Sequence, residues 1–192
     1  FTPGKAVSRQ GAKLTILADQ SVLASGKSPA KDEYVITGGL PAATYTTFRL
    51  DALTHPSLGN RNGPGRNAKD PNFVLNELTI DHIPADSATA RRLKVREALA
   101  DFEQKGWQVK GAFDGKPKTG WAISPGFGKD HLGRFTLDAP LEIKEGDQLK
   151  ITLSQQYGSQ LCLGRIRLYA GQSGTEDRSL SELKTAMLVS LS

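Results

Sequence analysis

Aromatic and planar polar side chains in turn-like segments are the residues of this sequence best suited to recognising a ligand. Tyr157 lies in the polar stretch 155–159, and Trp107 follows a Gln-Lys-Gly segment. An aromatic ring can pack against the apolar C–H face of a pyranose while amide, guanidinium and imidazole groups bond to its hydroxyls. The residue types therefore predict a sugar site made from Tyr157, Trp107, Arg61, Asn62, Arg66 and His131.

Two of the candidate residues, Trp107 and Arg66, and the second tryptophan, Trp121, also have a purely structural interpretation. Trp107 can equally be a core residue, and Trp121 is favoured as one. Arg66 follows a Gly-Pro-Gly segment, where a guanidinium often ties a loop together through backbone carbonyls.

Catalytic chemistry has little support in the sequence. Glu77 and Asp114 could be proposed as a glycosidase pair, but the mechanism depends on a carboxylate separation that sequence does not give. The histidines, His55, His82 and His131, lack metal-ligand spacing and are expected to be surface or hydrogen-bonding residues. There is no phosphate-binding glycine loop and no nucleophile elbow. We therefore expect a non-catalytic protein.

Composition excludes several classes of function. The 192 residues suffice for one domain, and the formal charge of +5 is dispersed rather than gathered in a basic block. We therefore expect no nucleic-acid partner, although a preference for acidic polysaccharide is compatible with the charge. No apolar run is long enough to span a membrane. The single cysteine, Cys162, cannot form an internal disulfide and is interpreted as a small buried apolar residue.

Alternating apolar residues predict an all-β protein. The residues expected to face its core include Phe48, Leu50, Leu149, Ile151, Leu153, Ile166 and Leu168. Strands are expected within 13–17, 22–24, 34–37, 44–50, 73–80, 133–137, 147–153 and 161–168. About eight strands with frequent turns predict a jelly-roll or galactose-binding-like β-sandwich over residues 1–173. Segment 93–102 is ambiguous and is predicted as a strand with an irregular turn, whereas 54–72 is predicted as a long surface loop. Residues 174–192 have leucines at helical spacing, which predicts a helical tail or the start of a following region.

Two segments resemble the discoidin and coagulation-factor type C domains, which are galactose-binding-like sandwiches. The first contains Phe113-Asp114-Gly115 followed by Thr119-Gly120-Trp121, and the second is the strand 72–80 with its glutamate, Glu77. The resemblance implies a structural calcium ion held by Asp114, Thr119 and Glu77, whose oxygens suit Ca²⁺. In discoidin domains the glutamate strand follows the Asp-Gly turn, so the order here would be permuted. The alternative is a hydrogen-bonded turn with Glu77 exposed or paired with an arginine.

A broader resemblance covers about residues 10–170. The segments 19–26, 48–53, 63–66, 72–77, 113–115, 119–123 and 163–168 resemble a module inside large exported proteins of planctomycete-type bacteria that also carry cytochrome c-like domains. The start at Phe1, without a methionine, fits a fragment of such a protein, and the Cys-x-x-Cys-His haem motif is absent. The resemblance implies an extracellular or periplasmic module that binds polysaccharide or oligosaccharide. The alternative is an architectural domain that docks neighbouring domains of the parent chain.

Overall fold

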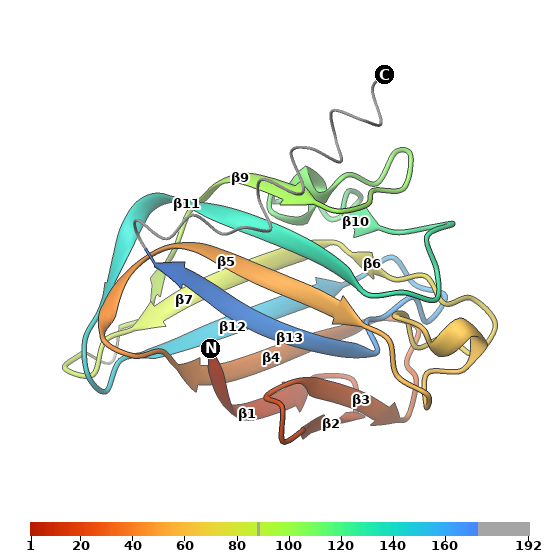
Figure 1. Cartoon of the computed structure of the whole chain (residues 1–192), viewed down its shortest axis with the longest axis horizontal. Coiled ribbons are helices and arrows are strands. Elements are labelled where there is room, and N and C mark those ends of the chain that lie inside the picture. The colour runs from red at the N-terminus through yellow and green to blue at the C-terminus, as the bar shows by residue number, and fades with distance from the viewer. Residues whose placement is uncertain (88, 173–192) are drawn as a thin grey trace.

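The protein is an all-β sandwich, as the sequence predicts (Figure 1). The computed structural model describes residues 1–87 and 89–172. The predicted C-terminal tail, 174–192, lies outside the described residues. Among the described residues, no helix is long and apolar enough to cross a membrane.

Two antiparallel sheets form the layers of the sandwich, and a short ribbon adjoins them. The five-stranded sheet has the order β1 (Thr2–Ser8), β4 (Asp32–Gly39), β12 (Gln148–Gln155), β7 (Glu77–Ile83) and β8 (Arg91–Arg92). The six-stranded sheet has the order β2 (Ala12–Ile16), β3 (Val22–Gly26), β13 (Arg165–Gln172), β5 (Ala43–Leu53), β11 (His131–Ile143) and β9 (Val95–Ala100). The ribbon pairs β6 (Val74–Leu75) with β10 (Trp121–Ala122). Two 3-10 turns, η1 (Asn60–Asn62) and η2 (Val109–Ala112), lie in the connections.

The core forms because both sheets turn an apolar face inward. In β12 the predicted inward residues Leu149, Ile151 and Leu153 are buried, and β13 contributes Ile166 and Leu168. Side chains of both sheets belong to one continuous apolar cluster. Side chains in a strand point alternately to its two faces, so one face of each sheet is dry and the other carries polar residues.

A bulge in β5 changes which of its residues face the core. Phe48 and Leu50 are buried as predicted, but Tyr45 is buried as well. The pairing of β5 with β13 is shifted by one residue between Tyr45 and Thr47, which reverses the alternation at that point. The hydroxyl of Tyr45 donates to the Pro41 carbonyl at 2.9 Å, so the buried phenol is satisfied.

The sequence underestimates the number of strands, because several are short or polar. β1, β8 and β10 were not expected, and the predicted strand 73–80 is divided between β6 and β7 at Asn76. The start of 161–168 is a loop rather than a strand. The ambiguous segment 93–102 contains β9, as favoured. The loop 54–72 is not wholly a surface loop, because Leu58 and the Gly63–Gly65 segment are buried.

Trp121 anchors the ribbon to the core, as its place in the sequence suggests. The side chain is fully buried and meets the ring of Phe73 edge to face at 5.0 Å. Its indole nitrogen donates to the Phe102 carbonyl at 2.9 Å. Trp121 therefore joins the core to two loop segments by packing and by a hydrogen bond.

Replacing this anchor should destabilise the whole domain. We expect Trp121→Ala to lower the free energy of unfolding by about 3–5 kcal/mol, because it leaves a cavity and an unpaired carbonyl. Urea denaturation followed by circular dichroism measures the change. Val7→Ala, at a position that is 43% exposed, is the control and should leave the midpoint almost unchanged. A Trp121→Ala midpoint equal to that of the control would show that this ring is not an anchor.

Candidate functional site

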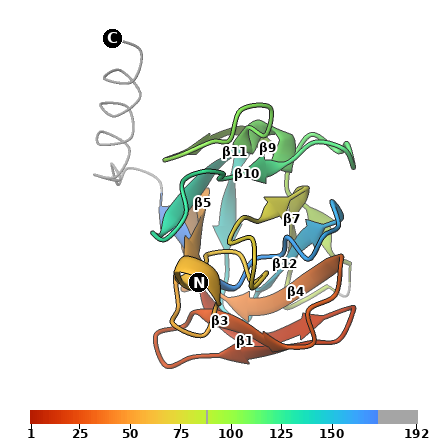
Figure 2. The same ribbon diagram turned by 90° about the vertical axis from the view of Figure 1, so that its right-hand side faces the viewer.

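Several loops gather at one end of the sandwich, called the loop end below. They are the connections β3–β4, β5–β6, β9–β10, β10–β11 and β12–β13, and they lie on the right of Figure 1 and face the viewer in Figure 2. Backbone and side-chain hydrogen bonds tie them to one another. Asn67 donates to Ser159 O at 2.8 Å, Gln160 to Ser28 O at 2.8 Å, and Gly128 N to Gly63 O at 3.1 Å.

The structure brings the two predicted aromatic residues together at the loop end. The rings of Trp107 and Tyr157 lie 5.2 Å apart at an interplanar angle of 89°. Tyr157 is 51% exposed, whereas Trp107 is half-buried against Val74, Ala122 and Leu161. Trp107 thus packs on a small apolar cluster of its own and supports an exposed tyrosine ring.

The other predicted sugar ligands at the loop end are not part of this pair. Arg61 and Asn62 are exposed in η1 with left-handed backbone angles, and the Arg61 guanidinium lies over the Phe127 ring at 6.0 Å. Arg66 is half-buried and donates to the Gly26 carbonyl at 3.2 Å, while its backbone N–H donates to Cys162 O at 2.9 Å. Arg66 therefore ties the loop together, which is the structural interpretation of this residue.

His131 is buried rather than presented to a ligand. Its side chain is fully enclosed, and Nδ1 lies 2.9 Å from Asp101 Oδ2. Its other nitrogen, Nε2, bonds to the Gly126 carbonyl. Because both ring nitrogens are occupied inside the protein, His131 joins β11 to the neighbouring loops and is not available to a sugar.

Three buried amide side chains hold the backbone of the loop end. Asn72 Oδ1 accepts from Ile123 N at 3.0 Å, and Gln155 Oε1 accepts from Leu163 N at 2.6 Å. Asn76 Oδ1 accepts from Gln156 N at 2.6 Å. All three are at most 5% exposed. They satisfy backbone groups that would otherwise be buried without partners.

The Asp114–Thr119 turn contacts Glu77 as the resemblance implies, but through hydrogen bonds. Asp114 Oδ1 accepts from Lys116 N at 2.9 Å and from Thr119 Oγ1 at 2.8 Å. Glu77 Oε2 accepts from Gly115 N at 3.1 Å. Burial raises the pKa of Glu77, and the nearby Asp114 carboxylate adds to this rise.

These residues do not fit a calcium ion as they are arranged. Asp114 Oδ1 and Glu77 Oε2 already accept from protein donors, and the Thr119 hydroxyl donates to Asp114. The neighbouring carbonyls of Pro117 and Thr119 accept from Asn76 Nδ2 at 3.2 and 2.8 Å. Within 1–87 and 89–172 there is also no group of three His, Cys, Asp or Glu residues suited to a metal. The hydrogen-bonded turn is the alternative that the sequence left open, with Glu77 bonded to the turn instead of exposed.

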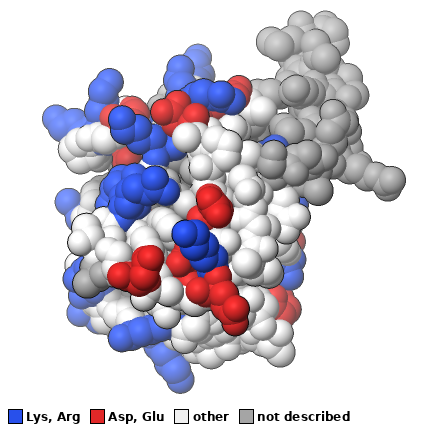
Figure 3. All heavy atoms as spheres, turned by 90° about the vertical axis from the view of Figure 1, so that its left-hand side faces the viewer, with Lys and Arg blue, Asp and Glu red and all other residues white. Residues whose placement is uncertain are grey.

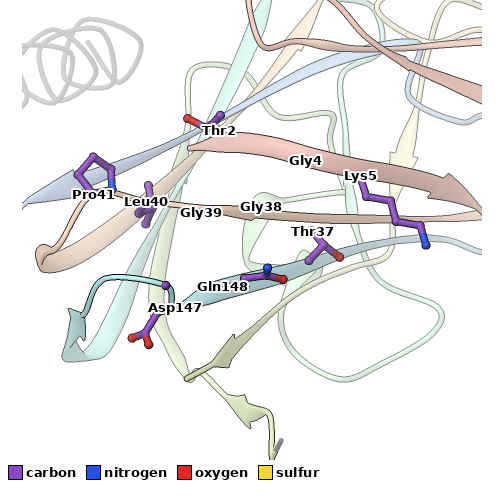
Figure 4. Close-up of a pocket in the computed structure, with 11 residues that line it drawn as sticks. Thr2, Gly4, Lys5, Thr37, Gly38, Gly39, Leu40, Pro41, Asp147 and Gln148 are labelled. Atoms are coloured by element: carbon purple, nitrogen blue, oxygen red, sulfur yellow. The ribbon is translucent and has the colours of Figure 1, made fainter. Parts of the chain in front are cut away.

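Two hollows lie at the opposite end of the sandwich. One, of about 740 Å³, lies between the start of β1, the end of β4 and the start of β12, with Lys5, Thr37 and Gln148 around it (Figure 4). The other, of about 560 Å³, is lined by His82, Arg91, Glu142 and Lys144 among others. Figure 3 looks onto this end and shows cationic and anionic side chains interspersed, with no large patch of one sign.

A buried, hydrogen-bonded pair, His82 and Asp147, lines the second hollow. His82 Nε2 lies 2.8 Å from Asp147 Oδ2, and Asp147 also accepts from the backbone N–H groups of Lys144 and Ala85. These hydrogen bonds, with smaller contributions from His82, lower the pKa of Asp147 to about 2. The pair joins the β7–β8 and β11–β12 connections, so His82 is a hydrogen-bonding residue as expected.

Comparison of the chain with protein-family models, with curated proteins and with solved structures finds no match. The assignment of a site therefore depends on the geometry of the chain itself.

Sequence reasoning missed Asn76, whose side chain bonds to three backbone groups at the loop end. The only signal was a polar pair, Asn76-Glu77, that interrupts an otherwise apolar strand. The side chain of Asn76 bonds to residues that are 41, 43 and 80 positions away along the chain. Contacts of that range have no local pattern.

The low pKa of Asp147 predicts an acid-sensitive fold. A carboxylate whose folded pKa lies below its unfolded value stabilises the protein above about pH 4 and loses that effect as the pH falls towards about 2. We expect Asp147→Asn to be less stable than wild type at pH 7 and to lose less stability between about pH 5 and pH 2. Urea denaturation across this range measures both. The exposed control Asp138→Asn should keep the wild-type slope, and an Asp147→Asn slope as steep as wild type would contradict the prediction.

Proposed function

We propose that the protein is a non-catalytic carbohydrate-binding module of an exported protein, and that Tyr157 is its platform for polysaccharide. The observation that carries the proposal is the Trp107–Tyr157 pair. Among the described residues, Val7 and Tyr157 are the exposed large apolar side chains, and only Tyr157 is braced by a second aromatic ring. A large ring that remains exposed although an apolar cluster lies beside it suggests a contact surface.

The surroundings of the pair suit a sugar. A tyrosine loses little conformational freedom on binding, and here the edge of a perpendicular ring restricts it further. Its loop is anchored on both sides, by Asn76 to Gln156 N and by Gln155 to Leu163 N. The side chain of Asn67 in the neighbouring loop donates to the carbonyl oxygen of Ser159, two residues along the chain from Tyr157. A rigid ring beside polar groups is the combination by which a pyranose is held.

Loss of the platform should weaken binding without unfolding the protein. We expect wild type to be retarded by at least one member of a panel of plant and algal polysaccharides in affinity electrophoresis. Tyr157→Ala should weaken that binding about tenfold, or about 1.4 kcal/mol. Tyr157→Phe should retain most of it, because the stacking face is kept. Tyr169→Phe, on the six-stranded sheet, is the control. Wild type that binds none of the panel, or Tyr157→Ala that binds like wild type, would refute the proposal.

A second candidate function is docking of an acidic segment from a neighbouring domain. It is favoured by the outer face of the six-stranded sheet, where β13, β5 and β11 place Tyr169, Arg49 and Arg134 side by side. The guanidinium of Arg49 lies 4.2 Å and that of Arg167 5.2 Å from the centre of the Tyr169 ring. Arginine and tyrosine are enriched in protein interfaces. Asp51 and Asp19 pair with these arginines and reduce their net charge.

The two candidate functions predict different mutant phenotypes. If the sheet face is a docking surface, we expect the double variant Arg167→Ala with Tyr169→Ala to lose capture of the neighbouring domains in a pull-down while polysaccharide retardation is unchanged. Tyr157→Ala should show the reverse. If the double variant still captures the neighbouring domains, the outer face of the six-stranded sheet is not the docking surface.

A further inference from the structure

Asn76 lies where three distant segments meet. It occupies the junction between β6 and β7, is 2% exposed, and its own N–H donates to Ser154 O at 2.9 Å. Nδ2 donates to the carbonyl oxygens of Pro117 and Thr119 at 3.2 and 2.8 Å. Oδ1 accepts from Gln156 N at 2.6 Å. One side chain thus joins the Asp114–Thr119 turn to the start of the loop that carries Tyr157.

The orientation of the amide follows from its partners. The backbone N–H of Gln156 can only donate, so the atom facing it must be the amide oxygen. The amide nitrogen then faces the two carbonyls, which can only accept. The side chain therefore meets each group with the complementary end.

The turn is also pressed closely against the Asn76 segment. A Cβ at Gly120 would lie 2.6 Å from Leu75 O and 3.0 Å from the Cα of Asn76, so this position requires glycine. The carbonyl oxygens of Pro117 and Thr119 both lie within hydrogen-bond distance of Asn76 Nδ2, and two such oxygens need a group with positive charge character between them. A metal cation can supply it, and here the N–H groups of the amide do.

We infer that the Asn76 amide takes the place of a structural cation at the Asp114–Thr119 turn, and that the loop end is held in shape without calcium. This assignment departs from the calcium ion that the resemblance to discoidin-like domains implies. Asn76 is also a positioning residue for Tyr157, because its amide oxygen holds the backbone N–H of the preceding residue, Gln156. Only this last consequence depends on the proposed function.

Thermal unfolding with CaCl2, MgCl2 or EDTA at equal ionic strength tests the inference. Wild type should melt at the same temperature in all three. Asn76→Ala should melt about 5–10 °C lower, because it removes three hydrogen bonds that a 2% exposed side chain makes to the backbone, and it should not respond to calcium. Asn76→Asp removes the donors and places a carboxylate beside the two carbonyls. It should melt lower than wild type in EDTA and regain several degrees in CaCl2 but not in MgCl2.

Each outcome decides the inference. A wild-type melting temperature that falls in EDTA and recovers in CaCl2 overturns it, and this measurement needs no variant to fold. If Asn76→Ala is as stable as wild type, the Asn76 side chain does not hold the turn. If calcium does not raise the melting temperature of Asn76→Asp, the amide does not occupy the place of a cation. Affinity electrophoresis adds an independent readout, in which Asn76→Ala should weaken retardation and wild type should bind equally in EDTA. If no polysaccharide binds at all, the proposed function fails. The melting data still test whether the Asn76 amide holds the turn without calcium.

Discussion

The loop end depends on one constraint, which is that backbone groups buried between loops must find hydrogen-bond partners. Regular strands satisfy their own N–H and C=O groups, but the loops that join them cannot. Here Asn72, Asn76 and Gln155 supply the missing partners from side chains that are almost fully buried. An unpaired buried group costs about 1–3 kcal/mol, so the loss of one of these amides should lower the free energy of unfolding by at least that amount. Without them the loops would separate and the Trp107–Tyr157 pair would lose its support.

This dependence explains why the exposed aromatic ring, rather than a hollow, marks the candidate site. The hollow of about 740 Å³ at the opposite end is lined by glycines and by polar side chains such as Thr37 and Gln148. Its lining includes no aromatic ring. The His82–Asp147 pair beside it is engaged with the backbone of two connections. At the loop end, by contrast, an aromatic platform and a network that fixes its position occur together.

The sequence predicted what depends on local pattern and missed what depends on distant contacts. Alternation identified the inward residues of β12 and β13, and the Thr-Gly-Trp segment identified Trp121 as a core residue. The polar turn around Tyr157 made that ring a candidate platform, but its exposure and its contact with Trp107 come from the structure. Alternation could not show the bulge that turns Tyr45 inward, since one inserted residue reverses the face of the strand. Nor could composition show that His131 is enclosed by Asp101 and Gly126, 30 and 5 residues away.

An amide and a cation hold a loop in physically different ways. A calcium ion gathers six to eight oxygens and its affinity varies with the surrounding charge, so a calcium-held loop responds to its medium. The Asn76 amide joins three backbone groups with neutral hydrogen bonds whose strength is nearly independent of salt and of the available metal. It also leaves Asp114 and Glu77 to cap the N–H groups of Lys116 and Gly115. A turn held in this way keeps one shape, and the rigidity passes through Gln156 N directly to the residue before Tyr157.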